Sequence, residues 1–136
     1  MDEELHFVDR NQWRAWLSRN YASKKGVWLV YFKKHTGKCC IPYDDSVEEA
    51  LCFGWIDGII KRVDDEKCAR KFMPRKSRSK WSESNKRRAE KMIREGKMTE
   101  VGMAKIEDAK KNGEWFKSSA VSKNLMIPTF IEEALT

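Results

Sequence analysis

The sequence lacks the marks of a membrane-spanning, exported or low-complexity protein. None of its apolar runs approaches the roughly 18–20 residues that cross a bilayer. The first residues, Met1–Glu4, are acidic and lead into no apolar segment, unlike a secretory signal. Only 7 glycines and 3 prolines are present, and no segment repeats, which argues against linkers and repeat architectures. We therefore expect a cytoplasmic protein without a membrane span.

Cysteine and histidine are scarce, and their spacing argues against a metal centre. No C-x-x-C pair occurs, and adjacent cysteines seldom ligate one ion well. The chain contains Cys39, Cys40, Cys52, Cys68, His6 and His35. We expect no metal, no cofactor and reduced thiols that act as small buried hydrophobic side chains. The alternatives are a zinc site that recruits a histidine and a redox-active thiol.

Motifs of catalysis and nucleotide binding are absent too. The chain has no G-x-S-x-G, no G-x-G-x-x-G and no Walker pattern. Thr36-Gly37-Lys38 alone predicts a turn rather than a phosphate loop. A dyad of His35 with Cys39 or Cys40 would rest on proximity in sequence only. We predict no catalytic residue from these patterns, and a binding protein is favoured over an enzyme.

The apolar content is that of one folded domain. Hydrophobic residues make up 40% of the 136 residues, aromatic residues 11%, and six are tryptophan. Apolar periodicity and capping residues predict helices over 10–21, 46–53, 82–95 and 99–112, and strands over 27–32, 55–63 and 68–73. We predict an α+β fold, in which a small three- to four-stranded mixed sheet packed against helices occupies residues 1–80. A helical hairpin follows within 81–136.

Finer features of these elements can also be predicted. Ser46 and Glu49 form a capping-box pattern at the start of the second helix. A fourth short strand is expected near 39–41, and strands 27–32 and 55–63 would be parallel if they are neighbours. A last short helix is expected from Pro128, with Ile131 and Leu135 on its apolar side. It stops at Thr136, as in a natural short form or a chain without a C-terminal piece.

The net charge of +7 is concentrated in one segment. Residues 61–97 carry 15 Lys or Arg and 6 Asp or Glu, whereas each flanking segment has a net charge of −1. Arginines beside an aromatic side chain and a helix start suit a phosphate, a nucleic-acid backbone or an acidic lipid. The alternative is a solvated basic face. A membrane-surface helix is disfavoured because the apolar face of 82–95, formed by Ala89, Met92 and Ile93, is narrow.

Asp57 lies inside an apolar strand, where a carboxylate needs partners. It could act as a general base or bind a donor group of a ligand. The alternative is a buried ion pair with Arg62, Lys71 or Arg75. The pairs Asp44-Asp45 and Glu48-Glu49 are instead explained by a helix start, and Asp64-Asp65 by a turn.

Long sequence motifs resemble those of the bacteriocin-protection family, also called YdeI/OmpD-associated proteins. The similarity lies in 28–38, 48–58, Phe72-x-Pro-Arg75 and Ser79–Ser82. Shorter matches follow between Asn85 and Trp115. The resemblance implies bacteriocin or envelope-stress protection and no catalytic residue set. Members usually continue for roughly fifty more helical residues, and Cys39-Cys40 departs from the family pattern.

The charge pattern and the resemblance indicate the same region. The predicted ligand-binding residues are Trp55, Asp57, Arg62, Lys71, Arg75, Lys80, Trp81, Asn85 and Arg88. The preferred interpretation is a protein that binds an anionic ligand or a protein partner, in an oligomeric state that no pattern specifies. One alternative is an enzyme for a phosphorylated or acidic small molecule with Asp57 as acid/base. Another is a single-stranded nucleic-acid-binding protein with Trp81 as the stacking residue.

Overall fold

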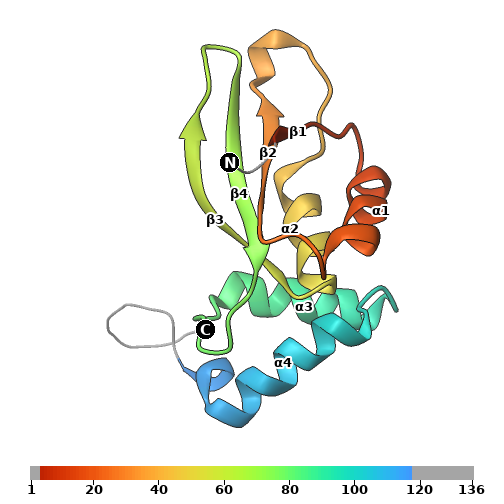
Figure 1. Cartoon of the computed structure of the whole chain (residues 1–136), viewed down its shortest axis with the longest axis vertical. Coiled ribbons are helices and arrows are strands. Elements are labelled where there is room, and N and C mark those ends of the chain that lie inside the picture. The colour runs from red at the N-terminus through yellow and green to blue at the C-terminus, as the bar shows by residue number, and fades with distance from the viewer. Residues whose placement is uncertain (1–3, 118–136) are drawn as a thin grey trace.

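A four-stranded sheet and four α-helices form residues 4–117, the part of the chain that the computed structural model describes (Figure 1). The strands are β1 (Glu4–Leu5), β2 (Val27–Phe32), β3 (Trp55–Arg62) and β4 (Lys67–Pro74). The helices are α1 (Arg10–Asn20), α2 (Tyr43–Cys52), α3 (Glu83–Arg94) and α4 (Glu100–Asn112), with 3₁₀ turns at Lys34–Thr36 and Glu114–Phe116. The helix predicted from Pro128 lies outside the described residues.

The sheet has the order β1-β2-β4-β3 and is mixed, which confirms the predicted α+β class. β1 is parallel to β2, whereas β4 is antiparallel to both β2 and β3. One finer prediction is wrong. The fourth strand is Glu4–Leu5, and the segment 39–41 makes a single backbone hydrogen bond, from Ile41 N to Phe7 O. β2 and β3 run in the same direction because each is antiparallel to β4, but they are not neighbours, since β4 lies between them.

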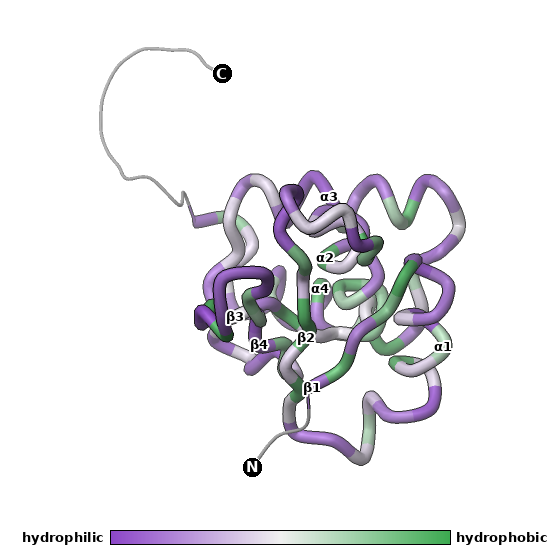
Figure 2. The backbone as a smooth tube through the Cα atoms, turned by 90° about the horizontal axis from the view of Figure 1, so that it is seen from above, coloured by the Kyte–Doolittle hydropathy of each residue, from purple (hydrophilic) through white to green (hydrophobic). Residues whose placement is uncertain are grey.

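The two faces of the sheet differ in what covers them. Val27 and Leu29 of β2 belong to the hydrophobic core, and α1 and α2 lie on the same side of the sheet (Figure 2). Because side chains alternate along a strand, Trp28, Val30 and Phe32 point to the opposite face. These three residues are outside the core cluster. We call this surface the open face.

Local capping signals place three of the four helix starts as predicted. Asp9, Ser82 and Thr99 each accept a hydrogen bond from the backbone N–H three residues later. Gly96 and Gly113 end the last two helices with φ of 74° and 88°, a left-handed conformation that glycine adopts without a steric penalty. One prediction for α3 is wrong, because Ile93 is 41% exposed and does not extend the buried side of the helix.

The start of α2 differs from its prediction. The helix begins at Tyr43 after Pro42, so Ser46 lies inside it and is no capping residue. Ser46 Oγ instead donates to Tyr43 O over 2.6 Å. α2 packs against α1, α3, α4 and β3, and all residues from Ser46 to Cys52 are buried. This central position carries two consecutive carboxylates, Glu48 and Glu49, into the interior.

Candidate functional site

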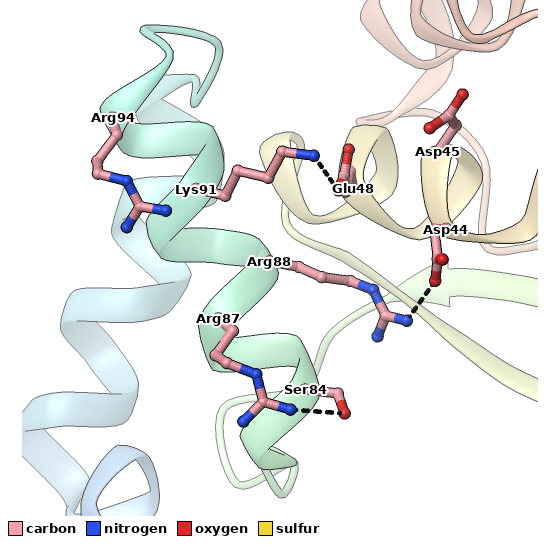
Figure 3. Close-up of a pocket in the computed structure, with 8 residues that line it drawn as sticks. All are labelled: Asp44, Asp45, Glu48, Ser84, Arg87, Arg88, Lys91 and Arg94. Atoms are coloured by element: carbon pink, nitrogen blue, oxygen red, sulfur yellow. Dashed lines mark hydrogen bonds and ion pairs between the residues drawn. The ribbon is translucent and has the colours of Figure 1, made fainter.

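A cleft of about 590 Å³ lies between α2 and α3 (Figure 3). The α2 wall is acidic and the α3 wall is basic. The lining residues are Asp44, Asp45 and Glu48 of α2, and Ser84, Arg87, Arg88, Lys91 and Arg94 of α3. The two walls are therefore complementary in charge, and a ligand would meet cations on one side and carboxylates on the other.

Two ion pairs cross this cleft. Arg88 Nη2 lies 2.6 Å from Asp44 Oδ1, and Lys91 Nζ lies 2.9 Å from Glu48 Oε2 (Figure 3). Arg88 is also held on its own helix, because its Nη1 donates to Asn85 Oδ1 over 2.9 Å. These contacts join α3 to α2 and fix the width of the cleft.

The acidic wall is neutralised from behind by α1. Arg10 binds Asp45, Glu48 and Glu49 at 3.1, 2.8 and 2.7 Å, and Arg14 Nη1 lies 2.7 Å from Glu49 Oε1. The residues Arg10, Arg14, Arg88 and Lys91 thus pair with Asp44, Asp45, Glu48 and Glu49. Cations and carboxylates balance in this network, so it holds α1, α2 and α3 together without an excess charge.

Glu48 gives the network a pH dependence. Burial by itself would raise the pKa of Glu48, but hydrogen bonds from Lys91 and Arg10 outweigh burial and lower it from 4.5. A carboxylate with a lowered pKa in the folded state stabilises the fold above its unfolded pKa. That stability is lost as the pH falls through the folded value.

We therefore expect the free energy of unfolding to fall as the pH drops below about 4.5. The Glu48→Gln variant should show a shallower fall, because it cannot take up this proton. Urea unfolding measured across the acid range tests this expectation. Glu90→Gln, at an exposed position of α3, is the control and should follow the native profile. Equal slopes for native protein and Glu48→Gln would contradict it.

Two arginines of the basic wall remain outside the network. Arg87 and Arg94 stay on the α3 side of the cleft, and both are exposed (Figure 3). Arg87 Nη2 has a 3.5 Å contact with Ser84 Oγ, and within residues 4–117 no carboxylate lies in ion-pair range of either guanidinium. Together with Lys91 they form the α3 ridge. Its ends are about 10 Å apart at 1.5 Å per helical residue.

Most of the predicted ligand-binding residues are not on this surface. Trp55 and Trp81 are 1% and 3% exposed. The Trp55 indole donates to Tyr21 O over 3.3 Å, and the Trp81 ring centroid lies 4.9 Å from that of Trp115. Both side chains therefore serve packing, and Trp81 has no free ring face for a nucleic-acid base.

Arg75 is buried rather than part of a basic surface. Its guanidinium lies 3.7 Å from the Trp81 ring centroid, and Nη1 donates to Lys80 O over 2.9 Å. Nε and Nη2 have no hydrogen-bond partner among the described residues. Burial lowers the pKa of Arg75 to about 10, although the charge of Asp57 opposes this shift. Arg75 thus packs against Lys80 and Trp81, which directly precede the N-cap of α3. It does not line the cleft.

The predicted partners of Asp57 are wrong. Its carboxylate accepts a hydrogen bond from Tyr43 Oη over 2.7 Å and lies 3.3 Å from Arg70 Nη1. A register shift between Asp57 and Ile60 lets Arg70 of β4 reach this position. Arg62 instead pairs with Asp65 on the exposed hairpin. Asp57 is therefore a structural carboxylate that ties β3 to the first turn of α2.

The remaining predicted residues divide between the cleft and other surfaces. Arg88 lines the cleft, and Asn85 is buried beneath it. Lys80 is exposed on the link before α3. Lys71 lies on the open face with its Nζ 5.4 Å from the Trp28 ring centroid. The predicted basic hairpin, link and helix are thus three separate environments.

The sequence patterns did not predict the buried ion pairs of Glu48 and Glu49. Both were explained as helix-start residues, but they lie in the middle of α2 at 5% and 1% exposure. The signal was their position between Val47 and the apolar residues Ala50 and Leu51, in a helix whose residues from Ser46 to Cys52 are all buried. A buried carboxylate requires a cation, and the only way to identify Arg10 and Arg14 was the tertiary contact.

Cysteines and acidic clusters show no metal chemistry in the described part of the chain. There, no group of three or more His, Cys, Asp or Glu side chains could hold an ion. The predicted burial of the thiols is correct for Cys52 and wrong for Cys39, which is exposed. Burial raises the pKa of Cys52 to about 11.

Among residues 4–117, no helix has the length and apolar character to cross a bilayer.

Comparison with known proteins identifies a family but no individual relative. No curated protein and no solved structure matches the chain. The sequence pattern of one family covers the sheet and both walls of the cleft, and ends within α4. The chain belongs to this family, which is described as "Domain of unknown function (DUF8412)" and matches residues 5–105.

Proposed function

We propose that the protein is a binding protein whose α3 ridge takes an anionic partner at the mouth of the α2–α3 cleft. The observation that carries the proposal is the pair Arg87 and Arg94, two exposed arginines without a carboxylate in ion-pair range among the described residues. The neighbouring cations Arg88 and Lys91 are held in place by cross-cleft pairs. The ridge therefore presents two arginines from a helix that cross-cleft pairs fix against α2.

Binding is favoured over catalysis at this site. Its carboxylates Asp45 and Glu48 already bind Arg10 and Lys91, so neither is a free acid/base. Asp57, the alternative catalytic residue, is anchored by Tyr43 and Arg70 away from the cleft. An arginine ridge instead suits carboxylates or phosphates, which guanidinium groups bind in bidentate geometry.

A role in bacteriocin or envelope-stress protection is a further part of this proposal. It is supported by the sequence resemblance alone. Two of the resembling motifs, Phe72-x-Pro-Arg75 and Ser79–Ser82, form the end of β4 and the capped start of α3. These motifs would then be retained for the support that they give to α3, rather than for direct contact with a partner.

The double variant Arg87→Ser with Arg94→Ser tests the site. Inorganic polyphosphate and polyglutamate serve as anionic probes, with affinity measured by calorimetry at low salt. We expect about a tenfold loss or more for the preferred probe, because a hydrogen bond to a charged group contributes roughly 1.5–3 kcal/mol. The affinity of the native protein should also fall with added salt.

A matched double variant separates a site from a general charge effect. Arg19→Ser with Lys25→Ser removes the same charge from exposed positions outside the cleft. It should leave the affinity nearly unchanged. An equal loss in both double variants, or no binding of either probe by the native protein, would refute the α3 site.

A further inference from the structure

The open face of the sheet carries aromatic side chains on β2 and lysines on the neighbouring strand β4. Trp28 and Phe32 lie on this face of β2, four residues apart, which is about 13 Å at 3.3 Å per residue. Each aromatic side chain has a lysine opposite it on β4. Trp28 pairs with Lys71 and Phe32 with Lys67 in the register of the two strands.

Lysine ammonium groups lie over both aromatic rings. Lys61 Nζ is 4.3 Å from the Trp28 ring centroid, and Lys38 Nζ is 5.0 Å from that of Phe32. Lys61 belongs to one edge strand and reaches Glu4 of the other edge strand, with a 3.0 Å ion pair. Its side chain therefore crosses the middle of the open face, where Val30 and Ala69 are buried.

These contacts are the kind that a ligand can replace. The Lys61–Glu4 pair is about two-fifths exposed on both sides, and the Lys38–Glu66 pair is half exposed. Exposed ion pairs and exposed cation–π contacts are weak. Stacking of a base on an aromatic ring is stronger, and each displaced ammonium can move to a phosphate.

We propose that the open face binds a single strand of nucleic acid, with bases stacked on Trp28 and Phe32 and phosphates held by the surrounding lysines. A four-stranded sheet with aromatic side chains on a face that no helix of residues 4–117 covers (Figure 2) is suited to unpaired bases, whose flat surfaces stack on it. Among residues 4–117, this face carries more lysines than carboxylates, namely Lys38, Lys61, Lys67 and Lys71 with Glu4 and Glu66, which suits a phosphate backbone. Trp81, the stacking residue expected from the sequence, is buried and takes no part.

Titration of the full chain with labelled oligothymidylate, read by fluorescence anisotropy at low salt, tests the proposal. Trp28→Ala and Phe32→Ala should each weaken binding about tenfold, as expected for the loss of one stacked base. Trp28→Phe keeps a ring and should retain most of the affinity. Inorganic polyphosphate, which has charge but no bases, should bind Trp28→Ala as well as it binds the native protein.

An NMR titration of the native protein avoids any effect of a variant on folding. The indole N–H signal of Trp28 should move with oligothymidylate, whereas those of the buried Trp55 and Trp81 should not. The proposal is overturned if oligothymidylate does not bind, or if the Trp28 signal stays in place. It is also overturned if folded Trp28→Ala binds like the native protein, or if polyglutamate binds the face more tightly, which would indicate an acidic protein partner. Arg87→Ser with Arg94→Ser leaves the open face intact, so the two proposals fail independently.

Discussion

Replacing Glu49 by glutamine should lower the free energy of unfolding by about 3–5 kcal/mol, the range for breaking a buried ion pair from one side. Glu49 is 1% exposed, and its two carboxylate oxygens lie 2.7 Å from Arg10 Nε and Arg14 Nη1. The amide carries no charge, and its NH2 group would face one of the two guanidinium groups with a donor in place of an acceptor. Arg14 would then lose the carboxylate that it pairs with, and Arg10 would keep only Asp45 and Glu48.

Denaturant unfolding followed by circular dichroism measures this loss. Glu66→Gln is the matched control, because it breaks the exposed pair with Lys38 at 2.8 Å. Exposed pairs contribute about 0–1 kcal/mol, so the control should remain close to the native protein. A loss below about 1 kcal/mol in Glu49→Gln would show that the network around α2 adds little to stability.

Gly102→Ala should also destabilise the fold, by about 3 kcal/mol, although alanine normally stabilises a helix. A Cβ at this position would lie 2.6 Å from the carbonyl oxygens of Leu51 and Cys52 and 2.4 Å from Met98 Sδ. The methionine can move, but the two backbone oxygens belong to the last turn of α2. α4 would have to withdraw from α2 to admit the methyl group.

The reverse substitution on the same helix provides the comparison. Ala104 is exposed, so Ala104→Gly should cost only about 1 kcal/mol through helix propensity. Gly102→Ala adds a methyl group and Ala104→Gly removes one from a different position of the helix. Both variants should lower the midpoint of denaturant unfolding. A more stable Gly102→Ala protein would mean that α4 does not approach α2 as closely as the structure has it.

Local signals in the sequence explain much of the fold. Asp9, Ser82 and Thr99 begin helices because a short polar side chain accepts a hydrogen bond from its own first turn. The β3–β4 hairpin was predictable because its partner strands are close in sequence. The placement of β1 beside β2 was not, since a two-residue strand has no periodicity of its own.

The candidate site was predicted less well than the fold. The basic segment 61–97 was found from charge alone, and within it Arg88 does line the cleft, with Asn85 as its hydrogen-bond partner. Its other members separate because alternate residues of a strand face opposite sides of the sheet. Arg70 and Lys71 are consecutive, yet Arg70 binds Asp57 on the helix side and Lys71 lies beside Trp28 on the open face.

The sequence by itself determined the class of fold, the helix starts except that of α2, and the segment that carries the excess positive charge. Each of these depends on residues that are near one another along the chain, so propensity and spacing are sufficient. Only the tertiary structure decided which charged side chains form ion pairs with one another. Arg10, Glu48 and Lys91 are dispersed over 82 positions, and their pairing leaves Arg87 and Arg94 exposed. Ion pairing depends on distance in space, which the order of residues does not specify.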